Sequence, residues 1–340
     1  MELKKSNLIM ILANLIICIS SIIIAKNIIK PSYANSSDDT KLAFNEQKLE
    51  NKFDVSDFSG TDIKNIDIVN KEYIPNQLTV LDSQFKINED TLNKFYQIVN
   101  SYGAGTSFYI VSLTDGMSIG YNVDKAFETA SSIKAPYALY IYKEIAKGNI
   151  DGNSKMAYQP QYYNKGTGII KNSDFGTEYT IKQLVYYSLT ESDNIAHQML
   201  HKNFGVKGYN DMLSSLGCKQ LYLTSGNPWG FTSARSAALV WQDIFNFSLN
   251  DETGIEFLNI LSNGKYNYFK EVMPSIPSAS KTGFASKDVV ETGIVFDKTP
   301  YIGIAIANKG GNIGAYTEVL KLVSVMNEIM NEYNTYKEIA

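Results

Sequence analysis

The sequence predicts an antiparallel sheet built from strands of both chain ends, flanked by a helical region and preceded by an N-terminal membrane-spanning helix. Two β-rich segments joined by a turn occupy residues 107–122, and β-rich segments return over residues 278–308. Most segments between them have helical character. Elements in this order imply one sheet assembled from both ends of the chain, with helices packed beside it.

The first thirty residues predict a membrane anchor or signal segment. Two lysines precede an apolar run over residues 8–25, which as a helix would span roughly 27 Å, close to the thickness of a bilayer core. A signal-peptide core is usually shorter, about 7–15 residues, so we expect an uncleaved anchor. Cleavage near Ser32-Tyr33-Ala34, which would release a secreted protein, is the alternative. The positive-inside rule places the lysines in the cytoplasm and the rest of this single-pass chain outside it.

Residues 31–86 are rich in Asn, Ser, Asp and Lys, and their short apolar patches lack sustained periodicity. This composition predicts an extracytoplasmic linker. We therefore expect three parts: the anchor or signal segment over 1–30, the linker over 31–86, and a folded domain over 87–340.

Within the folded domain, residues 88–102 carry apolar side chains at helical spacing and predict a helix. The segments 107–113 and 117–122, joined by an Asp–Gly turn, predict a hairpin. Helices are then expected over 131–147, 180–204, 207–216 and 233–248, the second opened by a capping box. Strands are expected near 278–284, 289–297 and 301–308, followed by a helix over 314–334.

Composition and charge exclude several classes of protein. A hydrophobic content of 44% and a charged content of 19% are typical of a globular domain. The net charge of −4 provides no basic field for a polyanion, so we expect no nucleic-acid partner. His197 and His201 are spaced like a metal pair, but no Glu or Cys lies nearby at ligand spacing. We therefore expect no metal and no cofactor.

Ser131-Ser132-Ile133-Lys134 is the first element that carries chemistry. Residues i and i+3 share a helix face, so Ser131 meets Lys134, while Ser132 has only Ala135 at that spacing. A serine hydroxyl is a weak nucleophile until a base takes its proton. A lysine can be that base where burial and nearby positive charge lower its pKa. Taken alone, the pattern is common by chance and more often marks a helix start with a surface lysine.

Two further short motifs follow. Ser192-Asp193-Asn194 lies in the helical region, where a hydroxyl can relay a proton and an amide can orient a substrate amide. A plain surface loop is its simpler interpretation. Lys281-Thr282-Gly283 lies on a predicted strand, where a cation and a hydroxyl can bind a carboxylate and glycine permits close backbone approach. Each tripeptide is a weak signal by itself.

The three motifs together, in this order, are a strong signal. In that combination the chain resembles the penicillin-recognising serine hydrolases, and most closely the class A β-lactamases. The likeness covers about residues 87–335. It implies an α/β sandwich in which an antiparallel sheet from both chain ends meets an all-helical lobe, with the reactive serine between them.

The resemblance implies that Ser131 is the nucleophile, that Lys134 is its base or proton relay, and that Ser192 passes a proton to the leaving nitrogen. It also implies substrate-binding positions. These are Asn194 for the substrate amide, Lys281 and Thr282 for its carboxylate, Gly283 for close approach, and the backbone amide of Ala285, which with that of Ser131 would form the oxyanion hole.

The chain departs from the family in one stretch. Class A β-lactamases carry a loop glutamate that activates the deacylating water, and the matching residues 217–231 contain no carboxylate. None occurs between Asp211 and Asp243. General-base catalysis contributes typically 10²–10⁴-fold, so we expect acylation of Ser131 followed by slow hydrolysis. A second departure is Glu291, which lies where many class A enzymes place an arginine for the substrate carboxylate.

The expected function is therefore a serine hydrolase that opens a β-lactam or related amide through an acyl-enzyme on Ser131. Two other functions stay open at this point. One is a cell-wall D-Ala-D-Ala carboxypeptidase or transpeptidase acting on peptidoglycan-like peptides. The other is a penicillin-binding sensor that stays acylated.

Overall fold

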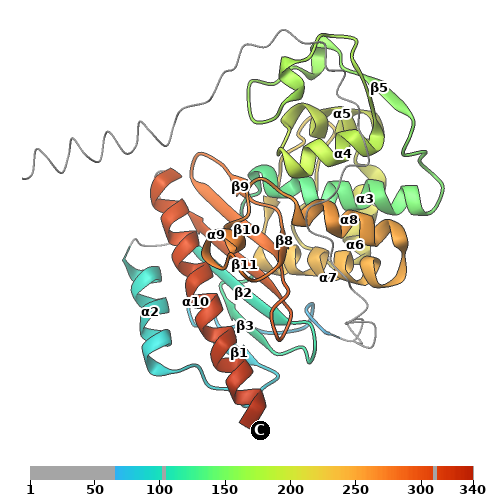
Figure 1. Cartoon of the computed structure of the whole chain (residues 1–340). Helices are drawn as coiled ribbons and strands as arrows, with labels where there is room; N and C mark the ends of the chain where they lie inside the picture. Colours follow the sequence, from blue (N-terminus) through green and yellow to red (C-terminus); the bar gives the residue numbers. More distant parts are fainter. Residues whose placement is uncertain (1–65, 102–104, 309–311, 340) are drawn as a thin grey trace, which may run out of the picture. The chain divides into compact units, whose positions relative to one another are not determined.

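The computed structural model describes residues 66–101, 105–308 and 312–339, and their central element is an antiparallel sheet (Figure 1). The strand order is β1-β3-β2-β11-β10-β8, and β9 pairs with β10. The strands are β1 (Thr79–Leu81), β2 (Thr106–Ser112), β3 (Ser118–Tyr121), β8 (Ser278–Ser280), β9 (Gly283–Phe284), β10 (Asp288–Val295) and β11 (Tyr301–Asn308). Because β11 pairs with β2 over its length, strands from both chain ends share one sheet, and this prediction is confirmed.

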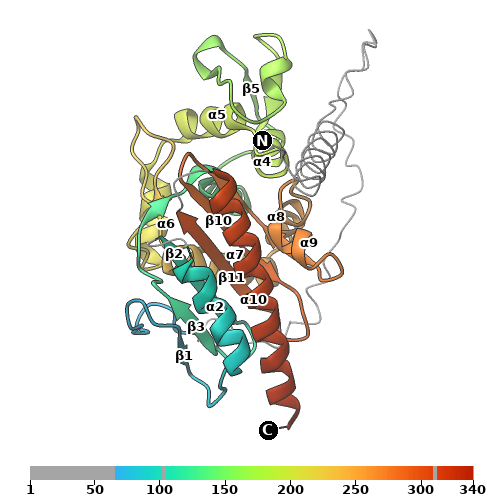
Figure 2. The ribbon, with the colours of Figure 1, turned by 90° about the vertical axis from the view of Figure 1, so that its left-hand side faces the viewer.

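Helices pack on both faces of the sheet. They are α2 (Glu89–Asn100), α3 (Lys134–Ala146), α4 (Ile181–Thr190), α5 (Asn194–Phe204), α6 (Lys207–Ser215), α7 (Ala234–Asn250), α8 (Glu252–Ser262), α9 (Tyr268–Val272) and α10 (Asn312–Ile339). Figures 1 and 2 show α2 and α10 side by side on one face, while α7 covers the other. Helices α3 to α6, with α8, form the helical lobe. Two small sheets add to this framework: β4 (Phe127–Glu128) with β7 (Phe231–Thr232), and β5 (Lys155–Ala157) with β6 (Glu178–Thr180).

Strand β2 shows why the sheet is covered on both faces. Successive strand side chains point to opposite sides, and every residue of β2 is buried. Phe108 and Ile110 join the apolar cluster under α2 and α10, whereas Tyr109 and Val111 join the cluster shared with the helical lobe. The near-continuous apolar sequence of this strand is thus the consequence of burial on both faces.

Three sequence predictions require correction. The single helix expected over 180–204 is wrong, because the chain breaks between α4 and α5 at Ser192, whose φ is +52°. Residues Ala130–Ile133 form a short 3-10 turn, η3, before α3 begins. The strand expected over 278–284 is interrupted at Lys281-Thr282, and helices α8 and α9 were not predicted. At Ser192, contacts of its carbonyl oxygen with Lys134 and Thr167, both distant in sequence, accompany the break.

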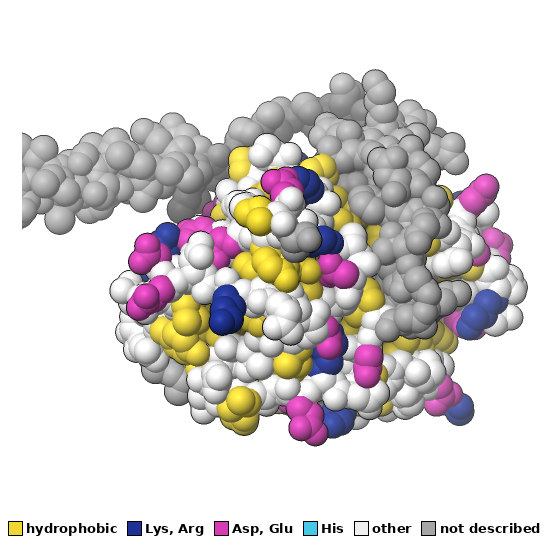
Figure 3. Space-filling view, turned by 90° about the horizontal axis from the view of Figure 1, so that it is seen from below, with side chains coloured by type: hydrophobic (Ala, Val, Ile, Leu, Met, Phe, Trp, Pro, Cys, Tyr) yellow, Lys and Arg dark blue, Asp and Glu magenta, His cyan; other side chains and the backbone are white. Residues whose placement is uncertain are grey.

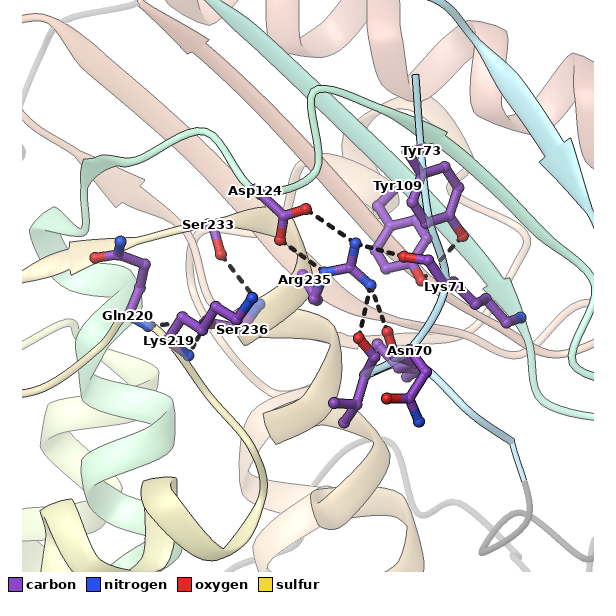
Figure 4. A network of polar contacts seen from close by, with 12 residues as sticks. Asn70, Lys71, Tyr73, Tyr109, Asp124, Lys219, Gln220, Ser233, Arg235 and Ser236 are labelled. Atoms are coloured by element: carbon purple, nitrogen blue, oxygen red, sulfur yellow. Dashed lines mark hydrogen bonds and ion pairs between the residues drawn. The ribbon is translucent and has the colours of Figure 1, made fainter. Parts of the chain in front are cut away.

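Residues 66–86, which the composition placed in the linker, lie against the folded domain. Strand β1 pairs with β3, and Ile68 is buried. Arg235 at the start of α7 holds this segment, donating to the backbone oxygens of Ile68 and Lys71 at 2.6 and 2.8 Å. Its other donors make a two-pronged ion pair with Asp124 at 2.7 and 2.9 Å (Figure 4). A planar guanidinium suits this divided role.

The expected membrane anchor, residues 1–30, lies outside the described residues. Among the described helices none is long and apolar enough to cross a bilayer. On the face seen from below in Figure 3, acidic and basic side chains lie interspersed.

Candidate active site

Lys134 is the centre of the site and is completely buried. Its Nζ lies 2.9 Å from Ser131 Oγ, 2.7 Å from Ser192 O, 3.2 Å from Ser192 Oγ and 2.6 Å from Asn194 Oδ1. Ser131, Ser192 and Asn194, three of the predicted site residues, thus all contact Lys134. The 3-10 turn at Ser131 leaves the i, i+3 proximity intact, because side chains three apart eclipse one another in that geometry.

Burial lowers the pKa of Lys134 well below its ordinary value, and the positive charge of Lys281 lowers it further, while Asp193 partly opposes both. A neutral amine has two N–H donors and one lone pair. Ser192 O and Asn194 Oδ1 can only accept, so they take both donors. The lone pair is then left for the hydroxyl of Ser131 at 2.9 Å. The surroundings therefore orient Lys134 as a proton acceptor toward Ser131.

Ser192 lies between two lysines. Its Oγ is 3.2 Å from Lys134 Nζ and 3.1 Å from Lys281 Nζ. The residue occupies the left-handed region of backbone conformation, and so does Ala130, whose φ is +45°. Such conformations are unfavourable for side chains with a Cβ and persist where surrounding contacts enforce them. The hydroxyl group of Ser192, and that of Ser131 next to Ala130, are thus both presented from strained turns.

Asp193 anchors the turn that presents Ser192. Its carboxylate accepts from the amides of Ile195 and Ala196 at 2.8 and 3.0 Å as the N-cap of α5. The other oxygen accepts from the amides of Ile169 and Ile170 at 2.6 and 2.8 Å. One buried carboxylate therefore joins the start of α5 to the 166–170 loop.

That loop contributes a residue that sequence reasoning did not place in the site. Thr167 Oγ donates to Ser192 O at 2.6 Å and lines the cleft in front of Ser131. Its flanking glycines are required, because a Cβ on Gly166 would lie 2.1 Å from Asn194 and one on Gly168 would lie 2.2 Å from Asp193. The sequence signal was the Gly166-Thr167-Gly168 pattern, which resembles the family but has no evident chemistry by itself.

Lys281 is buried to 2% exposure beside Ser192. Burial lowers its pKa to about 8, an effect that Glu291 on the neighbouring strand opposes. Glu291 is itself fully buried, and burial raises its pKa to about 8. Its neighbours along β10, Val289 and Val295 on the same strand face, belong to the cluster under α10. Glu291 therefore lies behind the Lys–Thr–Gly strand and not in the cleft.

Ala285 does not fit its predicted role. Its amide donates to Asp288 O at 2.8 Å within the turn between β9 and β10. Because N–H groups alternate between the two edges of an antiparallel strand, the amide that points away from β10 is that of Phe284. β9 runs close along η3, since a Cβ on Gly283 would lie 2.2 Å from Thr129 O and 3.0 Å from Ser132 N. The Phe284 amide therefore faces the Ser131 turn.

The acid-free loop, residues 217–231, closes the site on another side. Trp229 places its ring 5.4 Å from Lys134 Nζ. Two buried histidines hold the loop, with His197 Nε2 at 2.9 Å from Pro228 O and His201 Nε2 at 3.1 Å from Thr224 O. The His197 and His201 side chains, which the sequence suggested as a possible metal pair, thus bind backbone oxygens. Within the described parts of the chain no group of three potential ligands could hold a metal ion.

Two cavities open on either side of Ser131. The larger has a volume of about 630 Å³ and includes Ser192, Asn194 and Thr282 in its walls. The smaller, of about 400 Å³, lies between Phe284 and the acid-free loop at Asn227 and Trp229. A substrate can therefore extend in both directions from the serine, as an amide cleaved within a longer molecule requires.

Comparisons with known proteins agree with this geometry. Beta-lactamase VEB-1 of Pseudomonas aeruginosa is 30% identical over 129 residues, which is 37% of this chain and 43% of that protein, so the match spans less than half of that relative. The beta-lactamase of Sphaerobacter thermophilus has a similar fold, with a TM-score of 0.64 at 19% identity over 71% of this chain and 97% of its own. PBP-A gives a TM-score of 0.65 at 17% identity, over 72% and 97%. The model of the beta-lactamase enzyme family matches residues 90–332, and the chain belongs to that family.

Proposed function

We propose that this protein is a serine hydrolase that opens β-lactam rings or related amides through an acyl-enzyme on Ser131 and releases the acyl group slowly. The observation that carries the proposal is the set of contacts around Lys134. With both N–H groups of the neutral amine occupied by Ser192 O and Asn194 Oδ1, its lone pair accepts the proton of Ser131.

Acylation then follows from the positions of the other groups. Ser131 Oγ attacks the carbonyl as its proton passes to Lys134, and the backbone amides of Ser131 and Phe284 stabilise the oxyanion. When the C–N bond breaks, Ser192 donates its proton to the leaving nitrogen and regains one from Lys134. Lys281 supplies the positive charge for the substrate carboxylate, with Thr282 beside it.

Slow release of the acyl group follows from the acid-free loop on the other side of Ser131. Hydrolysis needs a base to deprotonate the attacking water, and residues 217–231 contain no carboxylate. The loop lines the cavity with Trp229 and Asn227, and neither side chain is a base. The carboxylate in the cavity wall is that of Glu128, an exposed residue of β4 outside this loop. We also propose that the N-terminal segment anchors the chain and holds the domain outside the cytoplasm, where β-lactams and cell-wall peptides are met; its lysines and its apolar run support this.

The same acid-free loop favours a second candidate, in which the acyl-enzyme formed with a β-lactam persists. The protein would then act as a penicillin-binding sensor, or as a D-Ala-D-Ala carboxypeptidase or transpeptidase that uses water or an amine more readily with peptides. A PBP-A variant of similar fold, with a TM-score of 0.65, was solved as an acyl-enzyme complex with penicillin G.

One experiment separates these functions. The full chain is mixed with a chromogenic cephalosporin while turnover and intact mass are followed. We expect one adduct per chain and a turnover far slower than its formation. Ser131→Ala should lose the adduct, whereas Ser132→Ala should keep it, because the Ser132 hydroxyl is buried and donates to Thr129 O at 2.7 Å.

Steady turnover without an accumulated adduct would contradict slow release. An adduct that forms equally in Ser131→Ala would contradict the nucleophile. A stable adduct together with release of D-Ala from a muropeptide would favour the peptidase, and a stable adduct without that release would favour the sensor.

A further inference from the structure

The cleft in front of Ser131 continues beyond the Lys–Thr–Gly strand into a pocket that the proposed reaction does not use. Past Thr282 its walls are Tyr266, Tyr268, Glu271 and Tyr316, which we call the tyrosine pocket. Glu271 is the one charged residue among the described residues that line the cleft.

The walls of the tyrosine pocket come from neighbouring elements and hold one another in place. Tyr268 and Glu271 lie on α9, and Tyr316 lies on α10, which runs beside it (Figure 1). The rings of Tyr268 and Tyr316 meet edge to face at 5.1 Å. The hydroxyl of Tyr316 donates to the Glu271 carboxylate. Tyr266 leaves 42% of its surface exposed at the entrance. A carboxylate is thus fixed beside aromatic rings at the end of the cleft.

The position of the tyrosine pocket identifies the part of a substrate that reaches it. Thr282 Oγ donates to Tyr266 O at 2.8 Å, so the pocket adjoins the residues that receive the substrate carboxylate. In a peptide cleaved at its C-terminal bond, that carboxylate belongs to the amine that leaves. In a β-lactam it lies on the ring that carries the leaving nitrogen, which stays tethered to the acyl group after the amide bond breaks. Substituents beyond the carboxylate therefore enter the tyrosine pocket.

A carboxylate beside tyrosine rings provides two attractions for a cation. One is the charge of the carboxylate, and the other is the negative face of each ring. We propose that the tyrosine pocket binds a cationic group on the leaving side of the substrate, so that zwitterionic substrates acylate Ser131 faster than their neutral-substituted counterparts. This inference rests on the proposed function. Either a cephalosporin with a cationic C3 group or a peptide with a basic C-terminal side chain supplies the required chemistry.

A matched pair of cephalosporins tests the proposal. Cephaloridine and cephalothin share one acyl side chain and differ at C3, which carries a pyridinium in the first and an uncharged acetoxy group in the second. We expect the full chain to be acylated by cephaloridine about three- to tenfold faster, a factor typical of one partly exposed cation contact. Glu271→Gln should bring the ratio of the two rates close to one. A second arm compares release of D-Ala and D-Lys from otherwise identical peptides.

Two controls keep the result specific. Glu252→Gln removes an exposed carboxylate of α8 that does not line the cleft, and should leave the rate ratio unchanged. Ampicillin and penicillin G differ by an ammonium on the acyl side, so Glu271→Gln should not alter their ratio. A cephaloridine-to-cephalothin ratio that Glu271→Gln leaves unchanged would overturn the inference.

A binding measurement distinguishes failure of this inference from failure of the proposed function. Binding of both cephalosporins to Ser131→Ala is measured by calorimetry, which needs no acylation. In this background too, Glu271→Gln should weaken the binding of cephaloridine alone. Equal binding of both compounds with and without Glu271 would overturn the inference, whether or not Ser131 is the nucleophile.

Discussion

The two sides of Ser131 differ in how they are built. On one side, the side chains of Ser131, Lys134, Ser192 and Lys281 form a chain of contacts between 2.9 and 3.2 Å in which every group can exchange a proton. On the other side, the acid-free loop presents Asn227 and Trp229 to the serine. The two buried histidines hold that loop by its backbone, so it too is positioned by direct contacts. The contrast therefore concerns chemistry and not order.

This difference teaches that acylation and deacylation are separable properties of the fold. The first needs a deprotonated lysine beside the serine, which burial and a second lysine favour by lowering the pKa of Lys134. The second needs a base near a water on the opposite side of the carbonyl, and the acid-free loop supplies none there; the carboxylate in that cavity wall is Glu128 of β4. Changes on either side should therefore act on one step alone.

Loss of the lysine should have the largest effect. Lys134→Met removes the proton acceptor of Ser131, and the acylation rate should fall by about 10²–10⁴-fold. The acylation rate of Lys134→Arg should fall as far, because a guanidinium stays protonated. Stopped-flow measurement with a chromogenic cephalosporin checks both variants. An arginine variant that acylates normally would show that the positive charge, and not proton transfer, is what Lys134 contributes.

Adding a carboxylate to the acid-free loop should have the next largest effect, and on the other step. Asn227→Glu places an acid on the wall of the cavity that Ser131 shares, and should raise deacylation by roughly 10- to 100-fold, part of the usual general-base contribution. Mass spectrometry of the adduct over time measures it, with Asn227→Gln as the uncharged control. An equal gain in the glutamine variant would attribute the effect to loop loosening.

The pH dependence of acylation should show both lysines. The rate rises with pH as Lys134 loses its proton, with a midpoint below the ordinary lysine value because its pKa is lowered. It should fall again near pH 8, where Lys281 becomes neutral and no longer attracts the substrate carboxylate. Lys281→Arg should remove the alkaline fall. Its persistence in that variant would assign the fall to another group.

The smallest effect concerns the loop's attachment. Burial lowers the pKa of His197 to about 3, below its ordinary value near 6.5, so the unfolded chain binds the extra proton between these values. Stability is then complete above pH 6.5 and falls below it by about 1.4 kcal/mol per pH unit. Urea unfolding at pH 6.5 and 5.5 measures the fall, which should be smaller in His197→Gln. An identical fall in that variant would mean that other groups cause it.

Local patterns predicted part of this site because they depend on neighbouring residues only. Ser131 and Lys134 stay close in a 3-10 turn or an α-helix alike. Asp193 caps α5 through adjacent amides, as its residue type favours. The helix break at Ser192 was missed because Lys134 and Thr167, both distant in sequence, bind its carbonyl oxygen. The sequence pointed to the amide of Ala285, and Phe284 was not considered, because amide direction depends on pairing with β10.

The sequence by itself determined the family, the short spacing of Ser131 and Lys134, the sheet built from both chain ends, and the absence of an acid over residues 212–242. Each follows from residue identity and short spacing. Only the tertiary structure decided that the pKa of Lys134 is lowered, because this shift depends on full burial and on Lys281 far along the chain. It also decided that the Phe284 amide faces the serine and that Glu271 lies at the end of the cleft, since only folding brings these groups together.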